Sequence, residues 1–174
     1  RVALAGRSGG IGDDGDRELF RWLRTQADAL LVGTGTLRAE GYGRPIRSDD
    51  LRAARAAIGL DPIPPLVTIT RSGALPLAIP LFQDPEARVI VYTEAAVTPP
   101  SCAAQVELRR IAPPAGVSPV AAAMRDLRVR DGIRSLLCEG GPSLLTALLR
   151  ERLLDELFLT VAPKLAGAGA GPAL

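Results

Sequence analysis

The feature that most constrains the fold of this 174-residue chain is the segment at residues 136–145. It begins with the apolar run Leu-Leu-Cys, continues with Glu139, Gly140 and Gly141, and then reads Pro-Ser-Leu-Leu. We interpret it as a buried strand that ends in a carboxylate, then two glycines, then a helix that opens on Pro142, because proline suits the first helical turn. Glu139 is then expected at the carboxyl end of a strand, where open α/β sheets bind their ligands.

The same alternation of short apolar runs and helical patterns extends over most of the chain. Helices are predicted where acidic or capping residues precede apolar residues at helical spacing, and strands where apolar, β-branched runs end in turn residues. The predicted helices cover residues 13–26, 34–40, 49–58, 118–130 and 144–149, and the predicted strands cover residues 29–33, 66–70, 87–93, 106–111, 133–138 and 157–161. We therefore predict a single α/β domain over residues 1–174, with a doubly wound, mostly parallel sheet flanked by helices.

Histidine is absent from the chain, and this excludes several classes of site. Without histidine there is no Ser-His-Asp triad, no histidine general base and none of the commonest zinc sites, so we expect no metal. Cys102 and Cys138 lie far apart in the sequence and are predicted to be free thiols of a reducing, cytoplasmic compartment. A net charge of +2 without a basic stripe interleaved with aromatics argues against a nucleic-acid partner. No apolar run is long enough to span a membrane.

A second strand–glycine–helix unit lies at residues 31–36, where Gly33 and Gly35 follow a predicted strand. Backbone amides at such a turn, together with the helix dipole, can hold a pyrophosphate. A Gly-x-Gly turn alone is a weak signal, and a tight turn without a ligand explains it at least as well. The companion unit at Gly140 and Gly141 strengthens the phosphate interpretation, because two such units in one small domain are harder to explain as turns.

Polar residues at other predicted strand ends and loops extend this candidate site. Arg71 and Ser72 follow a predicted strand, and they can hold a 2′-phosphate, which selects NADP, or form a solvated turn. Four arginines can bind a phosphorylated substrate or serve as surface charge, namely Arg24, Arg38, Arg44 and Arg47. Glu139 needs a partner so close to an apolar strand. It can accept hydrogen bonds from a heterocycle, titrate, or cap a neighbouring helix.

The aromatic residues are too few to form a cofactor-binding cluster. Phe20 returns at helical spacing with Leu19 and Leu23, and both Phe20 and Trp22 are predicted to lie in the core rather than in a cofactor site. Tyr42 stands in a loop between Gly41 and Gly43, and from there its ring can stack on the ring of a ligand. The aromatic residues therefore add one candidate, Tyr42, to the site.

Several motifs together indicate a family. Glu-Gly-Gly-Pro at residues 139–142 is followed by Asp-Glu-Leu at 155–157 and Ala-Pro-Lys at 162–164, and it is preceded by Gly-Arg-Ser at 6–8 and Gly-Thr-Leu-Arg-Ala-Glu at 35–40. Through these motifs nearly the whole chain resembles the reductase domain of bacterial riboflavin biosynthesis, which is the C-terminal half of the RibD deaminase-reductase. The resemblance implies a dihydrofolate-reductase-like fold and the NADPH-dependent reduction of a ribosylamino-pyrimidine phosphate, with hydride transfer to the carbon that was ribose C1′.

The resemblance also implies roles for individual residues and an assembly. The substrate-binding positions fall on Ser8, Arg24, Arg44, Arg47 and Glu139, and Glu139 is the candidate catalytic residue. The cofactor-binding positions fall on Thr36, Glu40, Arg71, Ser72, Gly141, Pro142, Ser143, Leu144 and Leu145, to which the strand-end argument adds Gly33 and Gly140. A cytoplasmic homodimer is expected from the resemblance alone.

The chain departs from the pattern of this family in ways that keep alternatives open. Where the family commonly shows Asp-Asp-Pro, this chain has Glu40-Gly41-Tyr42, as in a stand-alone, actinobacterial-type branch. The family's first strand and its C-terminal antiparallel strands are not found within residues 1–174. Two alternative functions therefore stand beside the pyrimidine reductase: a reductase of dihydrofolate or another pteridine on the same fold, and a non-catalytic NADP-binding module.

Overall fold

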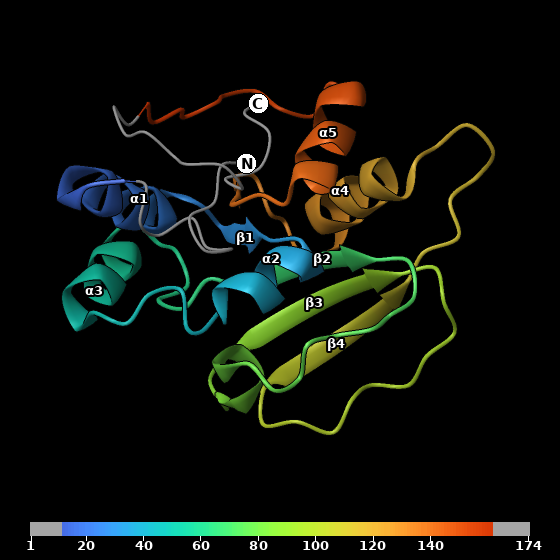
Figure 1. The fold of residues 1–174 in the computed structure, drawn as a ribbon, viewed down its shortest axis with the longest axis horizontal. Coiled ribbons are helices and arrows are strands. Elements are labelled where there is room, and N and C mark those ends of the chain that lie inside the picture. Colours follow the sequence, from blue (N-terminus) through green and yellow to red (C-terminus); the bar gives the residue numbers. More distant parts are fainter. Residues whose placement is uncertain (1–11, 162–174) are drawn as a thin grey trace, which may run out of the picture.

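The computed structural model describes residues 12–161, and a parallel sheet forms the centre of this part of the chain (Figure 1). The strand order is β4-β3-β2-β1-β5, and all four pairings are parallel. The strands are β1 (Ala29–Leu31), β2 (Leu66–Thr70), β3 (Arg88–Thr93), β4 (Gln105–Arg110) and β5 (Leu136–Cys138). The predicted α/β fold with a mostly parallel sheet flanked by helices is confirmed.

The order of the strands creates a switch point between β1 and β5. From β1 the chain proceeds through β2 and β3 to β4 on one side, whereas β5 pairs with the other side of β1 and places Cys138 opposite Leu31. Connections then leave the carboxyl ends of two neighbouring strands in opposite directions, and open α/β sheets bind ligands in the crevice that this creates. Both glycine motifs of the sequence follow these two strands.

Helices cover both faces of the sheet and enclose two apolar cores. The helical segments are α1 (Asp14–Gln26), α2 (Thr34–Glu40), α3 (Asp49–Ala57), η1 (Pro80–Gln83), α4 (Pro119–Arg130) and α5 (Pro142–Arg150). One core combines Val32 with Leu37 of α2 and Phe82 of η1, and the other combines Leu31 with Leu127 of α4. Neighbouring residues of a strand point to opposite faces, so Leu31 and Val32 serve different cores.

Capping residues explain where two of the helices begin. The Asp13 side chain accepts a hydrogen bond from the Asp16 N–H at 2.9 Å, and α1 follows it. Ser118 accepts from the Ala121 N–H at 3.1 Å, and Pro119 occupies the first turn of α4. Each side chain satisfies an amide that has no partner within its helix. The predicted helices at residues 13–26 and 118–130 are thereby confirmed.

Two expectations about apolar residues were wrong. Trp22 and Phe20 are not core residues, since 54% and 38% of their surfaces are exposed and neither core includes a residue of α1. Helical spacing identifies an apolar side of α1, but it does not determine whether that side meets the sheet. Phe20 instead lies beneath the Arg24 guanidinium, 4.4 Å from ring centroid to Cζ.

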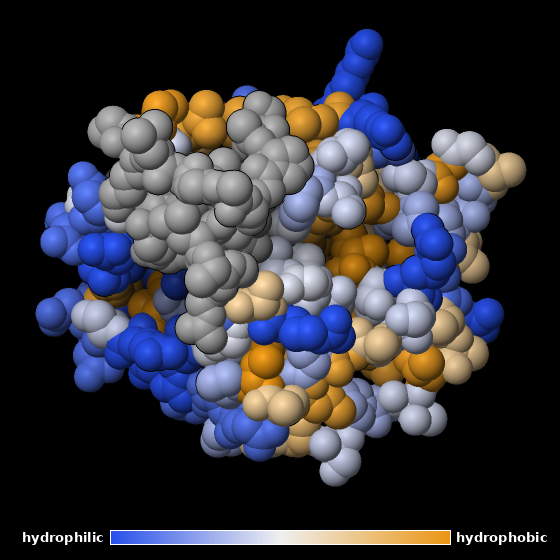
Figure 2. Space-filling model, viewed as in Figure 1, coloured by the Kyte–Doolittle hydropathy of each residue, from blue (hydrophilic) through white to orange (hydrophobic). Residues whose placement is uncertain are grey.

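The segment at residues 157–161 forms no strand with any other described residue. Its apolar side chains are exposed, with Leu157 at 63% and Leu159 at 67%. Figure 2 shows apolar side chains at the surface along the upper edge, where Figure 1 draws the chain that follows α5. The alternating pattern favours extended backbone, but a strand exists only where a neighbour pairs with its N–H and C=O groups.

Candidate active site

The two glycine motifs lie against each other at the carboxyl ends of β1 and β5. The Gly33 N–H donates to the Gly140 carbonyl at 3.0 Å. Gly140 and Gly141 have φ angles of +96° and +98°, in a region that residues with a Cβ rarely adopt. A Cβ on Gly141 would lie 3.4 Å from Thr36 Oγ1, whereas a Cβ on Gly140 would meet no atom within 4 Å. The turn is therefore closed against α2 on one side and open above Gly140.

Helix α5 begins directly after this turn, with Pro142 in its first turn. The Leu145 N–H donates to the Gly141 carbonyl at 2.9 Å, so the amides of Ser143 and Leu144 precede the first hydrogen bond of the helix. Amides in this position, together with the helix dipole, favour an anion. An open glycine turn followed by these amides fits the pyrophosphate of a nicotinamide dinucleotide.

Glu139 immediately precedes the glycine turn, and its side chain is only 3% exposed. Arg24, in the last turn of α1, donates from Nε to Glu139 Oε1 at 2.6 Å and from Nη2 to Oε2 at 2.7 Å. The Tyr42 hydroxyl donates to Oε2 at 2.5 Å and accepts from Arg24 Nη2 at 2.9 Å. The fold thus joins α1, the loop after α2 and the end of β5 in one group of side chains, which we call the Glu139 triad (Arg24, Tyr42 and Glu139).

Burial and charge together determine the protonation of the two partners of Glu139. Burial lowers the pKa of Arg24, but the hydrogen bonds and negative charge of Glu139 outweigh this effect and raise the pKa overall. Burial also raises the pKa of Tyr42, and the negative charge of Glu139 raises it further. Tyr42 therefore remains protonated at neutral pH and acts as a donor. Glu139 is accordingly an acceptor with three hydrogen bonds directed at it.

Arg55 on α3 binds the backbone at the end of α1, which carries Arg24 of the triad, and sequence reasoning missed this residue. Its fully buried guanidinium donates from Nη1 to the carbonyls of Arg24 and Ala27 at 2.7 and 2.6 Å, and from Nε to the Asp61 carbonyl at 2.6 Å. Arg55 thereby satisfies carbonyls at the C-terminal end of α1, which have no partner within that helix. The spacing of Leu51 and Arg55 could have indicated this position, because residues four apart share one face of a helix.

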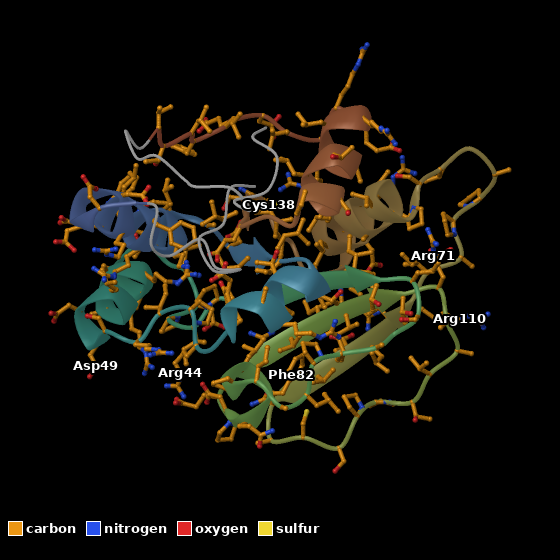
Figure 3. The ribbon with its side chains drawn as sticks, in the orientation of Figure 1. Arg44, Asp49, Arg71, Phe82, Arg110 and Cys138 are labelled. Carbon is orange, nitrogen blue, oxygen red and sulfur yellow. The ribbon has the colours of Figure 1, made fainter. Side chains whose placement is uncertain are left out.

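Arg44 and Arg47 occupy the loop before α3, but they have different surroundings. Arg44, labelled in Figure 3, donates from Nε and Nη2 to the two carboxylate oxygens of Asp84 at 2.6 and 2.5 Å. Its Nη2 also pairs with Glu86 at 2.6 Å. Arg47 is exposed and has no hydrogen bond or ion pair with another residue in the described range 12–161. Arg24 alone among the predicted substrate-binding arginines contacts Glu139.

The remaining predicted site residues lie around the same edge of the sheet or outside the described range. Arg71 and Ser72 follow β2 and are exposed, and Figure 3 draws Arg71 near Arg110 at this end of the sheet. Thr36 is buried beside Gly141, and Glu40 ends α2. Ser8 lies outside residues 12–161.

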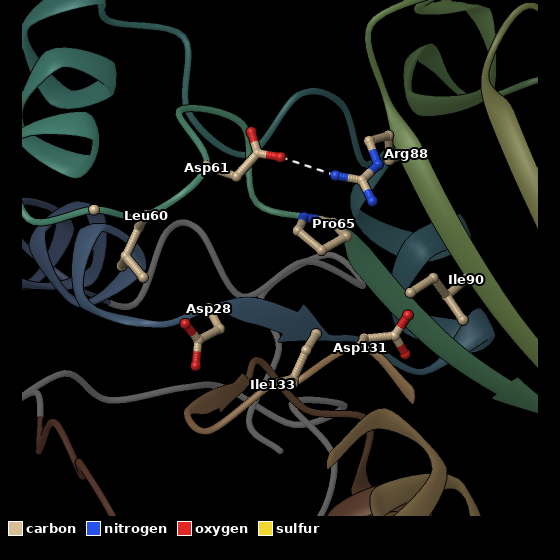
Figure 4. A pocket seen from close by; sticks show the side chains of 10 residues that line it. Asp28, Leu60, Asp61, Pro65, Arg88, Ile90, Asp131 and Ile133 are labelled. Atoms are coloured by element: carbon tan, nitrogen blue, oxygen red, sulfur yellow. Dashed lines mark hydrogen bonds and ion pairs between the residues drawn. The ribbon is translucent and has the colours of Figure 1, made fainter. Parts of the chain in front are cut away.

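A small cavity of about 190 Å³ opens at the opposite, amino-terminal edge of the sheet (Figure 4). Asp28 and Asp131 line it, and Asp61 pairs there with Arg88 at 2.8 Å. This cavity is separate from the Glu139 triad, because the two lie at opposite ends of β1. Within residues 12–161 we find no group of carboxylates and cysteines that could hold a metal ion, and no helix able to cross a membrane. Both Cys102 and Cys138 are free thiols, as predicted.

Comparisons with known proteins agree on one family. The model of the RibD C-terminal domain matches residues 1–174. A 2,5-diamino-6-ribosylamino-4(3H)-pyrimidinone 5′-phosphate reductase of Archaeoglobus fulgidus is 28% identical over 163 residues, which is 90% of this chain and 71% of that protein. The protein of the same name from Methanothermobacter thermautotrophicus is 28% identical over 168 residues, which is 96% of this chain and 74% of that protein.

A solved structure supports the same relationship. The pyrimidine reductase-like protein of Corynebacterium diphtheriae superimposes with a TM-score of 0.77 at 25% identity, and the match covers 97% of this chain and 71% of that protein. The parallel sheet and its flanking helices are therefore the fold of known pyrimidine reductase-like proteins.

Proposed function

The chain belongs to the RibD C-terminal domain family, and from this premise we propose that it is an NADPH-dependent reductase of a ribosylamino-pyrimidine phosphate. Its relatives named above are reductases of such a compound. One observation carries the proposal: at the junction of β1 and β5, the buried carboxylate of Glu139 directly precedes an open glycine turn and the start of α5. A polar substrate and a dinucleotide would meet at such a crevice.

The glycine turn and the first turn of α5 would hold the pyrophosphate of NADPH. The pyrophosphate would come close to the backbone at Gly33, Gly140 and Gly141, which have no side chains. The amides of Ser143 and Leu144 would supply hydrogen-bond donors. Thr36 and Glu40 on α2, Pro142 and Leu145 on α5, and Arg71 or Ser72 after β2 complete the proposed cofactor site. A guanidinium beside a hydroxyl favours a 2′-phosphate, and hence NADPH over NADH. When bound, the cofactor supplies the hydride.

The Glu139 triad would orient the heterocycle of the substrate. Three donors already point at Glu139, so it acts as a hydrogen-bond acceptor and positions the ring. Arg47, whose guanidinium has no partner in the described part of the chain, would bind the substrate phosphate. Arg44 would assist through Nη1, the nitrogen that Asp84 and Glu86 leave unused. Ser8 is proposed for the same subsite. These residues contribute orientation and electrostatics, whereas the reducing electrons come from the cofactor.

The test of this function is a turnover assay with purified protein. We expect the near-ultraviolet absorbance of NADPH to fall when either the diaminopyrimidinone or the aminouracil form of the ribosylamino phosphate is added. Dihydrofolate serves as a parallel substrate, and turnover of dihydrofolate alone would assign the pteridine alternative. NADPH binding without turnover of any of these compounds would indicate a non-catalytic module.

Substitution of Glu139 separates substrate binding from cofactor binding. We expect Glu139→Gln to keep its affinity for NADPH and to lose turnover of the pyrimidine, because the neutral amide has a single acceptor oxygen and cannot bind Arg24, Tyr42 and a substrate N–H together. Glu107→Gln is the matched control, since Glu107 on β4 pairs with Arg109 of the same strand and with Arg130 of α4, away from the crevice. A collapse of NADPH affinity in Glu139→Gln would contradict the role proposed for this residue.

We further propose that the enzyme acts on small molecules in the cytoplasm as a homodimer. Exposed apolar side chains at Trp22, Leu157 and Leu159 support an interface with another protein surface. Sedimentation velocity measures the assembly directly. A single species of monomer mass at micromolar concentration would contradict the dimer.

A further inference from the structure

Tyr42 is anchored on three sides. Its ring belongs to the core around Val32 and Phe82, and only 9% of the residue is exposed. Its N–H donates to the Leu37 carbonyl at 3.0 Å, and its carbonyl accepts from the Leu81 N–H at 3.0 Å. The position of its hydroxyl is therefore determined by α2, η1 and the core.

The hydrogen bonds of the triad leave Glu139 with little remaining capacity. An ionised carboxylate has about four lone-pair sites, two on each oxygen. Arg24 Nη2 and the Tyr42 hydroxyl both bind Oε2, which is thereby filled, whereas among residues 12–161 Oε1 accepts only from Arg24 Nε. The described part of the chain therefore leaves one lone pair on Oε1 of this buried side chain, and it is there that a ligand N–H can meet it.

We propose that Tyr42 is a positioning residue, which holds Oε2 of Glu139 so that Oε1 accepts a single hydrogen bond from an N–H of the substrate heterocycle. This inference rests on the proposed function, because it concerns how the same site presents Glu139. Without the hydroxyl, Oε2 regains a lone pair and the carboxylate can offer either oxygen. Tyr42 thus determines which oxygen the substrate meets.

The loop that carries Tyr42 makes this role specific for the substrate. The same loop carries Arg44 and Arg47, the residues proposed for the substrate phosphate, and Arg24 also donates from Nη1 to the Pro45 carbonyl of this loop at 2.9 Å. Tyr42 and Arg24 therefore connect the loop of the phosphate subsite to the carboxylate that meets the ring. The cofactor turn at Gly140 and Gly141 takes no part in these contacts.

The chain contains a matched control for Tyr42. Its second tyrosine, Tyr92, donates to Asp126 Oδ2 at 2.6 Å and accepts from Arg109 Nη1 at 3.0 Å. Tyr92 is also buried within an arginine–tyrosine–carboxylate group, but it belongs to the core on the other face of the sheet. Replacing either tyrosine with phenylalanine removes the same hydroxyl and leaves the packing in place.

The decisive experiment compares steady-state kinetics of Tyr42→Phe and Tyr92→Phe with those of the wild type. In Tyr42→Phe we expect kcat/KM for the pyrimidine to fall about 10- to 100-fold, mainly through KM, as for the loss of a hydrogen bond to a charged group. KM for NADPH should not change. Tyr92→Phe should match the wild type in both constants. The inference is overturned if Tyr42→Phe keeps the wild-type KM for the pyrimidine. It is also overturned if kcat/KM for the pyrimidine falls as far in Tyr92→Phe as in Tyr42→Phe.

A second measurement needs no turnover and separates failure of this inference from failure of the proposed function. In Tyr92→Phe, Tyr42 is the sole tyrosine, so tyrosinate absorbance follows its ionisation up to alkaline unfolding, which circular dichroism detects. Adding Glu139→Gln should bring this ionisation to lower pH, because a neighbouring negative charge is removed. If Tyr42 ionises at the same pH in both proteins while circular dichroism still shows the folded state, the contact is overturned even in an active enzyme. A shifted titration in a protein that reduces no pyrimidine supports the contact and rejects the proposed function.

Discussion

Arg44 and Arg47 stand three positions apart in one loop, yet their side chains are held in different ways. Asp84 and Glu86 fix Arg44, whereas Arg47 has no partner among residues 12–161. Asp84 accordingly has a lowered pKa, chiefly through its hydrogen bonds from Arg44. At the scale of single residues, Arg44 therefore combines a structural contact with its proposed ligand contact, and Arg47 is available to a ligand alone.

This difference predicts that replacement with glutamine has a different effect at each of the two positions. Arg47→Gln should raise KM for the phosphorylated substrate about tenfold through loss of a charge-assisted hydrogen bond, with no change in stability. Arg44→Gln should lower the free energy of unfolding by about 1–3 kcal/mol, because it leaves the partly buried Asp84 without its partner. Urea denaturation together with substrate kinetics distinguishes the two. A stability loss in Arg47→Gln, or none in Arg44→Gln, would refute this assignment.

Sequence reasoning at this scale identified Glu139 and Arg24, but not how they are connected. A carboxylate after an apolar strand needs a partner, which is a local argument, and that partner is Arg24. The hydroxyl of Tyr42 could not be assigned, since its contact depends on a loop and a helix that lie 97 and 115 positions from Glu139. Instead of leaving its ring free to stack on a ligand, the fold buries the ring in a core.

At the scale of elements, the glycine turn between β5 and α5 predicts a specific sensitivity. Gly141→Ala introduces a Cβ at φ +98° and 3.4 Å from Thr36 Oγ1, so we expect a loss of about 1–2 kcal/mol in stability and weaker NADPH binding. Gly59→Ala is the control, because Gly59 also has a positive φ, of +80°, but stands after α3 with nothing within 4 Å of its Cβ position. Calorimetric titration with NADPH should distinguish them, and equal affinities would contradict a phosphate site at this turn.

Asp28 connects the segments that precede β1 and β5 through hydrogen bonds. These contacts predict that the folded protein loses stability in acid. Burial raises its pKa, but hydrogen bonds from the Ser135 and Arg134 amides, each at 2.7 Å, lower it more, so the net pKa is below 3.8. The unfolded chain then binds the proton more tightly than the folded one. The stability from Asp28 is thus complete above its ordinary pKa and is lost as the pH falls through the lowered value.

We therefore expect the free energy of unfolding to fall on acidification below about pH 5, and to fall less in Asp28→Asn, which is already weakened at neutral pH. Urea midpoints measured across this range test the slope. Asp61→Asn is the matched control, because Asp61 lines the same cavity but is not bonded to the β5 segment. Parallel slopes for Asp28→Asn and the wild type would exclude Asp28 as the source.

Most elements of the fold could be predicted because their signals are local. The five central strands and their flanking helices could be predicted from capping residues, short apolar runs and glycine turns. The segment at residues 157–161 could not be predicted in this way, since a strand requires a neighbour that sequence alternation does not specify. For the same reason the apolar side of α1 was assigned to the core wrongly. Partner choice, rather than local propensity, separates the correct predictions from the wrong ones.

At the scale of the whole molecule, the strand order places both glycine motifs where the sheet changes direction, so that a ligand bound there contacts the ends of β1 and β5, which are far apart in the sequence. Binding at this junction must stabilise the entire domain, because β1 and β5 carry residues of the core beneath α4 and α5. NADPH at about 100 times its Kd should add about 2.7 kcal/mol and raise the unfolding midpoint by about 5–10 °C.

The same measurement distinguishes the two halves of the site within one molecule. In Glu139→Gln the stabilisation by NADPH should persist while that by the pyrimidine phosphate disappears, and in Gly141→Ala the reverse should hold. This crossed pattern follows because Glu139 and the glycine turn are adjacent in sequence but present different groups, a carboxylate on one side and backbone amides on the other. If either substitution abolished stabilisation by both ligands, the junction would be one undivided site, and the separate roles of carboxylate and glycines would have to be abandoned.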